Sequence, residues 1–338
     1  MSLPSKIIRS AGDLGLYQVA RLLTARTPRI LMYHRFSQSP KPGCVSQQRF
    51  REQVAYIKKF YQPMTLQALV ECLFEKRQVP RNAIVITVDD GYRDFYNVAW
   101  PILKELDVPA TLFATTGFID GALWLWPDKI TWLMAQLSGL NPGFRFGDFS
   151  MDAGEVNKHP RKAWQRIINH LLSVPDPEKH EFIDALATAW GIQIPVTAPD
   201  EYAACSWSEL ADMQNHGIEI GGHTVTHPTL GQVSRDQALA EIQGCMSMLA
   251  ERLPQGPSSF CYPNGMPSDF SAELMALVEE AGFHCAVAAF ADKAAMNYRY
   301  ALRRHSGGEG WFQFYKAVSG VEYLGNLLRG RQAEHLKL

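Results

Sequence analysis

The sequence predicts an α/β fold in which short strands alternate with helices and a separate helical segment is inserted near the middle of the chain. Apolar, β-branched runs alternate with amphipathic helical patterns up to Asp120, and the alternation resumes after residue 205. The chain has 338 residues, of which 46% are hydrophobic, so it can bury a substantial core. The first expected strands are 30–34, 83–88 and 110–115, and the first expected helices are 46–60 and 65–76.

Composition narrows the class of protein. The net charge of −1 gives no electrostatic reason to expect nucleic acid, so nucleic-acid binding is disfavoured. The six cysteines are widely separated and form no C-x-x-C pair, which argues against a disulfide framework or a zinc ribbon and fits a reducing compartment. The N-terminus lacks the continuous apolar region and the cleavage site of a signal peptide, so we expect a cytoplasmic protein.

Residues 1–27 form the first expected element, a helical segment that mixes apolar and basic side chains. Such a segment either lies peripherally on a membrane surface or packs against the outside of the domain, and the pattern fits both interpretations. Gly12 and Gly15 weaken the helix. Its apolar residues are Ile7, Ile8, Leu14, Leu16, Tyr17, Ala20 and Leu23, set among Lys6, Arg9, Arg21 and Arg26.

The strand pattern 83–88 ends on two adjacent carboxylates, Asp89 and Asp90, which are followed by Gly91. Neighbouring side chains of a strand face opposite ways, so both carboxylates reach one cavity only if the strand breaks there. Gly91 supplies the permissive backbone for such a break. The two carboxylates therefore form a candidate reaction centre, and a plain Asp-Asp-Gly turn is the alternative interpretation.

A second apolar run, 218–222, leads to His223 and His227, which are four residues apart and closed by Pro228. The flanking glycines and the proline place this pair in a strand-end loop rather than on a helix. With Asp90, the two imidazoles would supply three ligands to a divalent metal and leave a position open for water. We expect zinc first, with cobalt, manganese or nickel as alternatives.

These blocks resemble the signature of the NodB-homology polysaccharide deacetylases. TVDDG (87–91) is similar to the T-F-D-D-G block of that family, HTVTH (223–227) to its H-[ST]-x-x-H block, and PATLFATTGFI (109–119) to its second barrel strand. The resemblance covers about residues 28–120 and 200–305, and it implies a distorted (β/α) barrel that removes an N-acetyl group from a sugar. It also implies that Asp89 is the general base and that Asp90, His223 and His227 bind the metal.

A third block, SSFCYPNG (258–265), is similar to the F-x-Y-P-x-G variant of the family. By this resemblance the main-chain amide of Asn264 stabilises the oxyanion, and Tyr262 and Pro263 beside it are expected to contact the substrate. Cys261 stands near the position where the common form has an arginine that orients the base. Arg303, expected near the substrate, or its neighbour Arg304 would have to approach from the last strand instead. A plain proline turn is the alternative interpretation of this block.

Two histidines are candidates for the general acid, because the late histidine block of the family is not clearly present. His34 ends the apolar run 29–34, as in relatives that begin with a Y-H strand, and His305 ends the run 301–305 near the C-terminus. A histidine at a strand end can protonate the departing amine, since its ordinary pKa lies close to neutral pH. We favour His34.

Residues 121–205 interrupt the alternation of strand and helix patterns and predict a helical insertion that could act as a lid. We expect the aromatic Trp126 to face sugar rings, although packing of the insertion onto the barrel explains such tryptophans equally well. The domain is then one catalytic unit over 1–338. Its parts are the N-terminal segment 1–27, the barrel 28–120 and 206–320, and the insertion 121–205, with a Gly- and Phe-rich loop at 139–150 and helices at 161–174 and 177–192.

The function expected from these residues is metal-dependent N-deacetylation of an N-acetylated amino sugar. The expected substrate is a precursor in the synthesis of a cell-surface polysaccharide or a lipid-linked glycan. Two alternatives stay open: hydrolysis of another C–N bond, such as a cyclic amide or an N-formyl group, and a degenerate protein that binds carbohydrate without turnover. An enzyme requires Asp89, whereas a binding protein does not.

Overall fold

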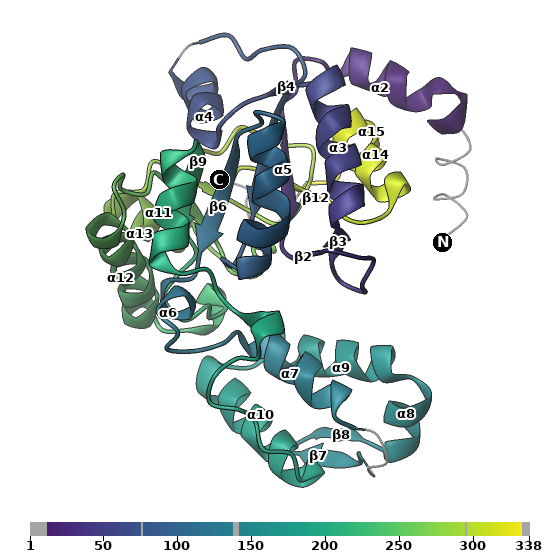
Figure 1. The fold of residues 1–338 in the computed structure, drawn as a ribbon, viewed down its shortest axis with the longest axis vertical. Coiled ribbons are helices and arrows are strands. Elements are labelled where there is room, and N and C mark those ends of the chain that lie inside the picture. The colour runs from purple at the N-terminus through teal and green to yellow at the C-terminus, as the bar shows by residue number, and fades with distance from the viewer. Residues whose placement is uncertain (1–11, 76, 138–141, 295, 333–338) are drawn as a thin grey trace.

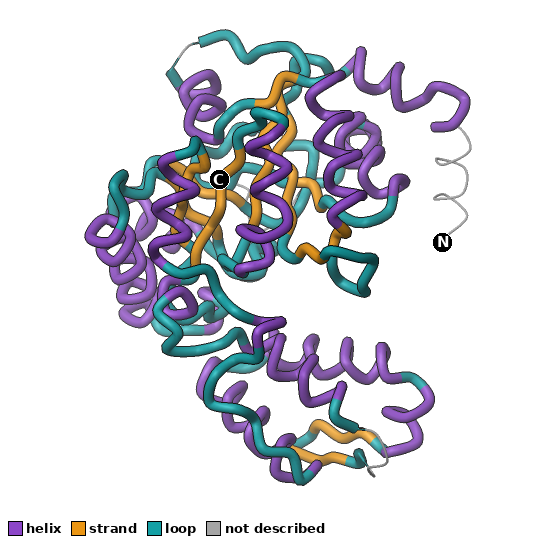
Figure 2. Tube along the Cα trace, viewed as in Figure 1, coloured by secondary structure: helices purple, strands orange, loops and turns teal. Residues whose placement is uncertain are grey.

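A curled, parallel sheet covered by helices forms the larger lobe of the protein, and a smaller, mostly helical lobe extends from it (Figures 1 and 2). The computed structural model describes residues 12–75, 77–137, 142–294 and 296–332. The smaller lobe lies below the sheet in Figure 1 and corresponds to the predicted insertion.

The sheet closes on itself through a short segment near the C-terminus. Leu302 bridges to Val287 at one edge of the sheet, and His305 pairs with Leu31 at the other edge. All strand pairs of the sheet are parallel, as in a (β/α) barrel. The distorted (β/α) barrel predicted from the sequence is thereby confirmed. Its strand order is β11 (Cys285–Val287), β10 (Ser259–Cys261), β9 (Ile218–Gly222), β6 (Ala110–Ala114), β5 (Ala83–Val88), β1 (Arg29–Tyr33) and β12 (His305–Ser306), and β4 (Gln62–Pro63) also pairs with β5.

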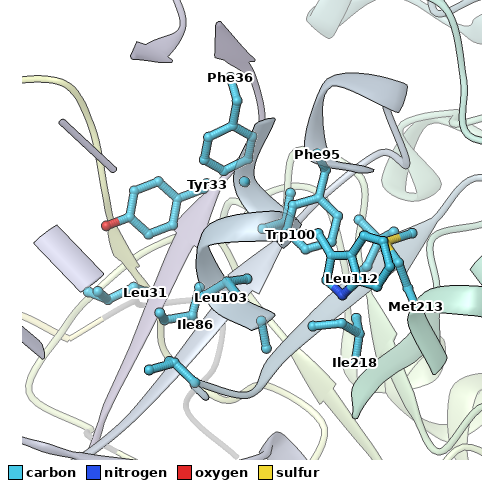
Figure 3. Packing of buried hydrophobic residues seen from close by; sticks show 14 of the residues in the cluster. Leu31, Tyr33, Phe36, Ile86, Phe95, Trp100, Leu103, Leu112, Met213 and Ile218 are labelled. Carbon is cyan, nitrogen blue, oxygen red and sulfur yellow. The ribbon is translucent and has the colours of Figure 1, made fainter. Parts of the chain in front are cut away.

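Strand β5 shows why the apolar runs of the sequence become barrel strands. All six of its residues are buried, so the strand needs an apolar side chain on both faces. Ile84 and Ile86 point outward and pack against the helices, whereas Val85 points inward to Phe113 and Leu302. Figure 3 shows the outward layer, in which Leu31, Ile86, Leu112 and Ile218 from four strands meet Phe95, Trp100, Leu103 and Met213 from the helices.

Helices of the larger lobe surround the sheet and connect its strands. The first two occupy the predicted segments, α3 the segment 46–60 and α4 the segment 65–76. The helices around the sheet are α3 (Gln47–Phe60), α4 (Leu66–Phe74), α5 (Trp100–Glu105), α6 (Thr116–Ile119), α11 (Trp207–Asn215), α12 (Arg235–Arg252), α13 (Ala272–Glu280), α14 (Trp311–Ser319) and α15 (Val321–Leu328). Shorter elements are β2 (Phe36–Ser37), β3 (Val45–Ser46), η2 (Phe95–Ala99), η3 (Asp200–Tyr202) and η4 (Leu230–Gln232).

The insertion folds around a hydrophobic core of its own, formed by residues such as Ile130, Ile167, Leu171 and Phe182. The sequence prediction of a loop over 139–150 is wrong for its described part, which contains an antiparallel hairpin. The rings of Phe144, Phe146 and Phe149 lie 5.0, 5.4 and 5.1 Å from that of Phe182, so burial of the phenylalanines stabilises the hairpin. The elements are α7 (Trp126–Ala135), β7 (Phe144–Phe146), β8 (Phe149–Met151), α8 (Ala153–Lys158), α9 (Pro160–Ser173) and α10 (Asp176–Trp190).

The described part of the N-terminal segment contains η1 (Gly12–Leu16) and α2 (Tyr17–Leu23). Tyr17 of α2 stacks on Tyr315 of α14 at 5.3 Å, so this helix packs against the outside of the barrel, as one of the two interpretations expected. Residues 1–11, with Lys6, Ile7, Ile8 and Arg9, lie outside the described residues. Large apolar side chains are exposed on α2, namely Val19, Leu22 and Leu23, and at Leu16 just before it, and membrane contact stays a prediction.

Among the described helices, none is both long enough and apolar enough to cross a bilayer.

Candidate active site

The first catalytic candidate, Asp89, points into the barrel because it continues the inward phase of β5. Val85 and Thr87 precede it on the same face, and Val85 belongs to the interior cluster. Its carboxylate accepts two hydrogen bonds from Arg304, at 2.6 Å from Nη1 and 2.8 Å from Nη2. Such a bidentate pair fixes both the position and the orientation of a carboxylate.

Arg304 comes from the segment just before β12 and is completely enclosed. Its guanidinium also donates to Thr87 Oγ1 at 3.0 Å and approaches Cys261 Sγ at 3.1 Å. Burial opposes ionisation of Asp89, but Arg304 and then His34 outweigh it, so the pKa of Asp89 lies below its ordinary value. The carboxylate is therefore ionised at neutral pH.

The second carboxylate, Asp90, reaches the same cavity because the strand breaks after Val88. The backbone enters the left-handed region at Asp90, with φ 79°, and at Gly91, with φ 95°. The positive φ favours glycine at position 91, where a Cβ atom would also lie 2.8 Å from Ile119 Cδ1 and displace the end of that side chain. The break expected from the sequence thus turns two neighbouring side chains toward one site.

Asp90, His223 and His227 together form a group that could hold a metal ion. Asp90 Oδ1 lies 3.4 Å from Nε2 of His223 and 3.4 Å from Nε2 of His227. The three ligand atoms lie within 4.8 Å of one another, and all three residues are buried. Burial lowers the pKa of His227, which favours the neutral imidazole that a metal requires, whereas for His223 the contacts with Cys261 and Asp90 outweigh burial and raise the pKa. Both histidines lie in the loop after β9, as the sequence predicts.

The histidine loop is held in a strained conformation by hydrogen bonds from outside it. Thr224 and His227 both have positive φ, at 66° and 62°. Glu241 of α12 accepts hydrogen bonds from the main-chain amides of Val225 and Thr226, both at 2.8 Å, and from Thr226 Oγ1 at 2.6 Å. His223 is oriented separately, because its Nδ1 lies 2.7 Å from the carbonyl oxygen of Cys261.

The carboxylates and imidazoles line a cavity of about 620 Å³ between the barrel mouth and the insertion. This volume lies in the range of about 300–1,000 Å³ that is usual for ligand sites. His34, Tyr262 and Asn264 also line it from the barrel side. The insertion contributes Leu125, Pro127, Asp128, Thr131, Trp164, Leu172, Glu201 and Tyr202.

Three further residues predicted from the sequence lie at this cavity. His34 Nε2 is 3.6 Å from Asp89 Oδ2, and its side chain is 46% exposed. Asn264 has φ 59° in the tight turn after β10, and its side chain donates a hydrogen bond to Thr229 Oγ1. Tyr262 is buried beneath the cavity and donates to the carbonyl oxygen of Tyr300. Their catalytic and binding roles stay predictions.

Four other predicted residues are not among those that line the cavity. His305 Nδ1 lies 2.8 Å from Glu322, and Arg303 pairs with buried Asp292. Successive side chains of an extended segment point to opposite faces. Because Arg304 points into the barrel, its neighbours Arg303 and His305 point away from the cavity. Trp126 belongs to the core of the insertion, so packing explains it better than sugar contact. Pro263 lies between two lining residues without lining the cavity itself.

Sequence reasoning missed a polar cluster that joins the insertion to the barrel mouth. Tyr92 donates a hydrogen bond to Asp128 Oδ2 at 2.6 Å, and Arg35 donates to Asp94 at 2.7 Å while stacking on the Tyr92 ring. Burial raises the pKa of Asp128 to about 7, although Tyr92 and Arg35 oppose this shift. Neither periodicity nor a local motif marks these residues, because their partners lie tens of residues away in the chain.

Comparison with known sequences identifies relatives of this chain. The family model described as "Polysaccharide deacetylase" matches residues 76–139 and 180–286, about half of the chain. A poly-beta-1,6-N-acetyl-D-glucosamine N-deacetylase of Escherichia coli (strain K12) is 34% identical over 71 residues. That match spans 21% of this chain and 11% of the E. coli protein.

Solved structures with a similar fold cover much more of the chain. The deacetylase PplD of Streptococcus pyogenes, in complex with acetate, matches 89% of this chain and 97% of its own, with a TM-score of 0.56 and 18% identity. IcaB from Ammonifex degensii matches 87% of this chain and 97% of its own, with a TM-score of 0.58 and 15% identity. At these identities the likeness establishes the fold.

Proposed function

Because the chain belongs to the polysaccharide deacetylase family, we propose that it is a metal-dependent hydrolase that removes the N-acetyl group of an amino sugar in a polysaccharide, a glycolipid or a sugar precursor. The observation that carries this proposal is the content of the cavity. Asp89, oriented by buried Arg304, lies beside the group formed by Asp90, His223 and His227. A carboxylate that acts as general base, next to residues that bind a metal, is an arrangement that can hydrolyse an amide.

The donor set of Asp90, His223 and His227 suits a divalent metal, with zinc as the first choice and cobalt, manganese or nickel as alternatives. The contact of His223 Nδ1 with the Cys261 carbonyl oxygen leaves Nε2 free to act as a ligand. When bound, such a metal supplies positive charge that acidifies water and polarises the acetyl carbonyl group.

Asp89 takes the role of general base in the proposed reaction. It removes a proton from the water that attacks the acetyl carbonyl carbon. Arg304 keeps the carboxylate ionised and aimed into the cavity, which is the task of the arginine missing at Cys261. The new C–O bond produces acetate, and cleavage of the C–N bond leaves a free amine on the sugar.

His34 is the proposed general acid, because it is the histidine candidate that lines the cavity. Its Nε2 lies 3.6 Å from Asp89 Oδ2, so it can deliver a proton to a leaving nitrogen bound close to the base. The main-chain amide of Asn264 is the proposed donor to the oxyanion, a type of contact that contributes several kcal/mol to catalysis.

Acetate release tests this function. Enzyme treated with a chelator is assayed on nucleotide-linked, lipid-linked and oligomeric N-acetylhexosamines, with and without added zinc or cobalt. We expect release only with metal, and a loss of about 10²–10⁴-fold in kcat for Asp89→Asn, because a general base contributes that much.

The metal content of Asp89→Asn serves as the control, since Asp89 is not one of the three proposed ligands. Retained metal with lost turnover supports a catalytic Asp89. Full turnover in the variant would contradict the proposed base, and no release from any N-acetyl sugar by metal-loaded enzyme would contradict the deacetylase itself.

A further inference from the structure

One wall of the cavity belongs to the insertion and carries groups that the proposed chemistry does not use. Figure 1 shows α7 and α9 on the side of the insertion that faces the barrel. Trp164 and Leu172 from α9 and Pro127 and Asp128 from α7 line the cavity there. The reacting amide has to sit at Asp89 and the metal ligands, so this wall is available to another part of the substrate.

Asp128 is an incompletely paired carboxylate on that wall. Its Oδ2 accepts a hydrogen bond from Tyr92, but Arg35 Nη1 lies 3.6 Å from Oδ1, beyond hydrogen-bond distance. Arg35 is already committed to Asp94 at 2.7 Å. A carboxylate oxygen can accept two hydrogen bonds, so Oδ1 has capacity for donors from a ligand. The residue is only 7% exposed and burial raises its pKa to about 7, so a ligand hydroxyl that donates to Oδ1 would stabilise the charged carboxylate.

Trp164 complements Asp128 with an apolar surface of fixed orientation. Its ring is half-buried, and its Nε1 donates a hydrogen bond to Thr131 Oγ1 at 3.0 Å, which anchors the ring edge in the insertion. Both residues line the cavity. An aromatic face beside a hydrogen-bond acceptor matches a sugar unit, which has an apolar C–H face and hydroxyl donors at its rim.

We propose that Asp128 and Trp164 of the insertion are specificity-determining residues that bind the sugar unit next to the one that is deacetylated. The inference rests on the N-deacetylase function proposed above. Asp128 accepts hydrogen bonds from the hydroxyl groups of the neighbouring unit, and Trp164 packs against its apolar face. The insertion then selects the substrate, whereas the barrel mouth carries out the hydrolysis.

Chain-length kinetics test the subsite with the full-length, metal-loaded protein. Acetate release is measured on N-acetylhexosamine oligomers of one to five units for wild type, Asp128→Asn and Trp164→Ala. For wild type we expect kcat/KM to rise when the second unit is added. In each variant we expect the ratio of kcat/KM on the trimer to that on the monomer to fall about tenfold, mostly through KM.

Gln165→Ala is the matched control, because Gln165 lies beside Trp164 on α9 but is exposed and pairs with Asn169. Circular dichroism of each variant checks that the insertion remains folded. Equal kcat/KM of wild type on monomer and trimer, or an equal loss on all lengths in both variants, would overturn the subsite.

Direct binding separates failure of the subsite from failure of the proposed reaction. If wild type releases no acetate from any oligomer, binding of the same oligomers is measured by calorimetry. Affinity that grows with chain length and falls in Trp164→Ala and Asp128→Asn upholds the subsite and removes only the proposed reaction. Absence of binding, or binding that both variants retain, overturns the subsite.

Discussion

The barrel mouth and the insertion both bury charged groups, but they place them differently with respect to the cavity. In the mouth, Asp89 and Arg304 form a buried pair that lines the cavity. In the insertion, the completely buried Lys179 pairs with Asp176 at 3.0 Å and lies 5.0 Å from the centre of the Trp126 ring, and none of the three lines the cavity. Similar interactions thus serve different purposes in the two lobes.

The difference indicates a division of labour within one chain. A buried ion pair costs desolvation free energy and adds little net stability, so a pair at a cavity is best explained by what it orients. The pair in the insertion lies within the first turn of α10, and its Lys179 contacts Trp126 in the core of that lobe rather than the cavity. The following predictions test whether the charged groups of the mouth serve the reaction and those of the insertion serve folding. They are ordered from the largest to the smallest expected change in free energy.

Arg304→Lys carries the largest expected effect. Lysine keeps the positive charge but lacks the planar fork that holds both oxygens of Asp89, so the base loses its orientation. We expect kcat to fall about 100-fold, since small misplacements of a catalytic group cost this much, with little change in KM. Steady-state kinetics of acetate release measure both values.

Arg303→Lys is the control for that substitution, because Arg303 is also buried and paired, with Asp292 at 3.0 Å, yet does not line the cavity. The division of labour predicts that Arg303→Lys lowers stability without a comparable loss of kcat. Equal losses of kcat in the two variants would show that general distortion, rather than orientation of Asp89, explains the result.

Asp176→Asn tests the folding role of the insertion through its pH dependence. Burial opposes ionisation of Asp176, but His180 and Lys179 outweigh it and lower its pKa to about 2. A carboxyl group whose pKa is lowered in the folded protein stabilises the fold at pH values above its ordinary pKa. This contribution is lost as the pH falls toward about 2. At pH 7 we therefore expect the variant to lose about 2 kcal/mol of unfolding free energy.

The difference in stability between wild type and Asp176→Asn should shrink as pH falls from about 4 to about 2. Urea unfolding followed by circular dichroism at several pH values measures it. Asp184→Asn, at an exposed position of the same helix, is the control. A stability difference that does not change with pH would contradict the assigned ion pair, and a large loss of kcat would contradict the division of labour.

Glu241→Gln carries the smallest expected effect and tests whether this side chain holds the histidine loop at the barrel mouth. The carboxylate accepts three hydrogen bonds from Val225 and Thr226, and an amide offers a donor where an acceptor is needed. The loop with His227 should then be less well held, and we expect metal affinity to fall about tenfold. Titration with zinc against a competing chelator measures the affinity.

Glu251→Gln, at an exposed position on the same helix, should leave zinc affinity unchanged. Unchanged affinity in Glu241→Gln as well would show that the histidine loop keeps its conformation without this carboxylate. The barrel mouth would then depend less on its supporting hydrogen bonds than the structure indicates.

Parts of the fold and site were predictable because their signals are local. The run 83–88 is apolar throughout, and it becomes β5 with the same bounds. The same applies to the two amphipathic segments of the insertion, which become α9 and α10. The hairpin of β7 and β8 was missed because its phenylalanines gain stability from Phe182, which lies 33 to 38 residues further along the chain.

The partners of the site residues were less predictable than the residues themselves. Asp89 and Asp90 stand out where an apolar strand ends on two charges, but the choice of Arg304 rather than Arg303 depends on which side chain points inward at barrel closure. The same closure directs His305 to Glu322, whereas His34 lines the cavity because it continues the inward set of side chains of β1. A shift of the segment 303–305 by one residue would point Arg303 and His305 inward and Arg304 away from the cavity.

The sequence by itself determined the elements of the barrel, the strand-end carboxylates and the paired histidines, because periodicity, glycine and proline act over a few residues. Only the tertiary structure decided that Arg304 holds Asp89 across 215 positions, and that Asp128 of the insertion meets Tyr92 of the barrel. The physical reason is that contacts between distant segments exist only once the sheet has curled and closed. A buried charge then takes the partner that this geometry brings within hydrogen-bond distance.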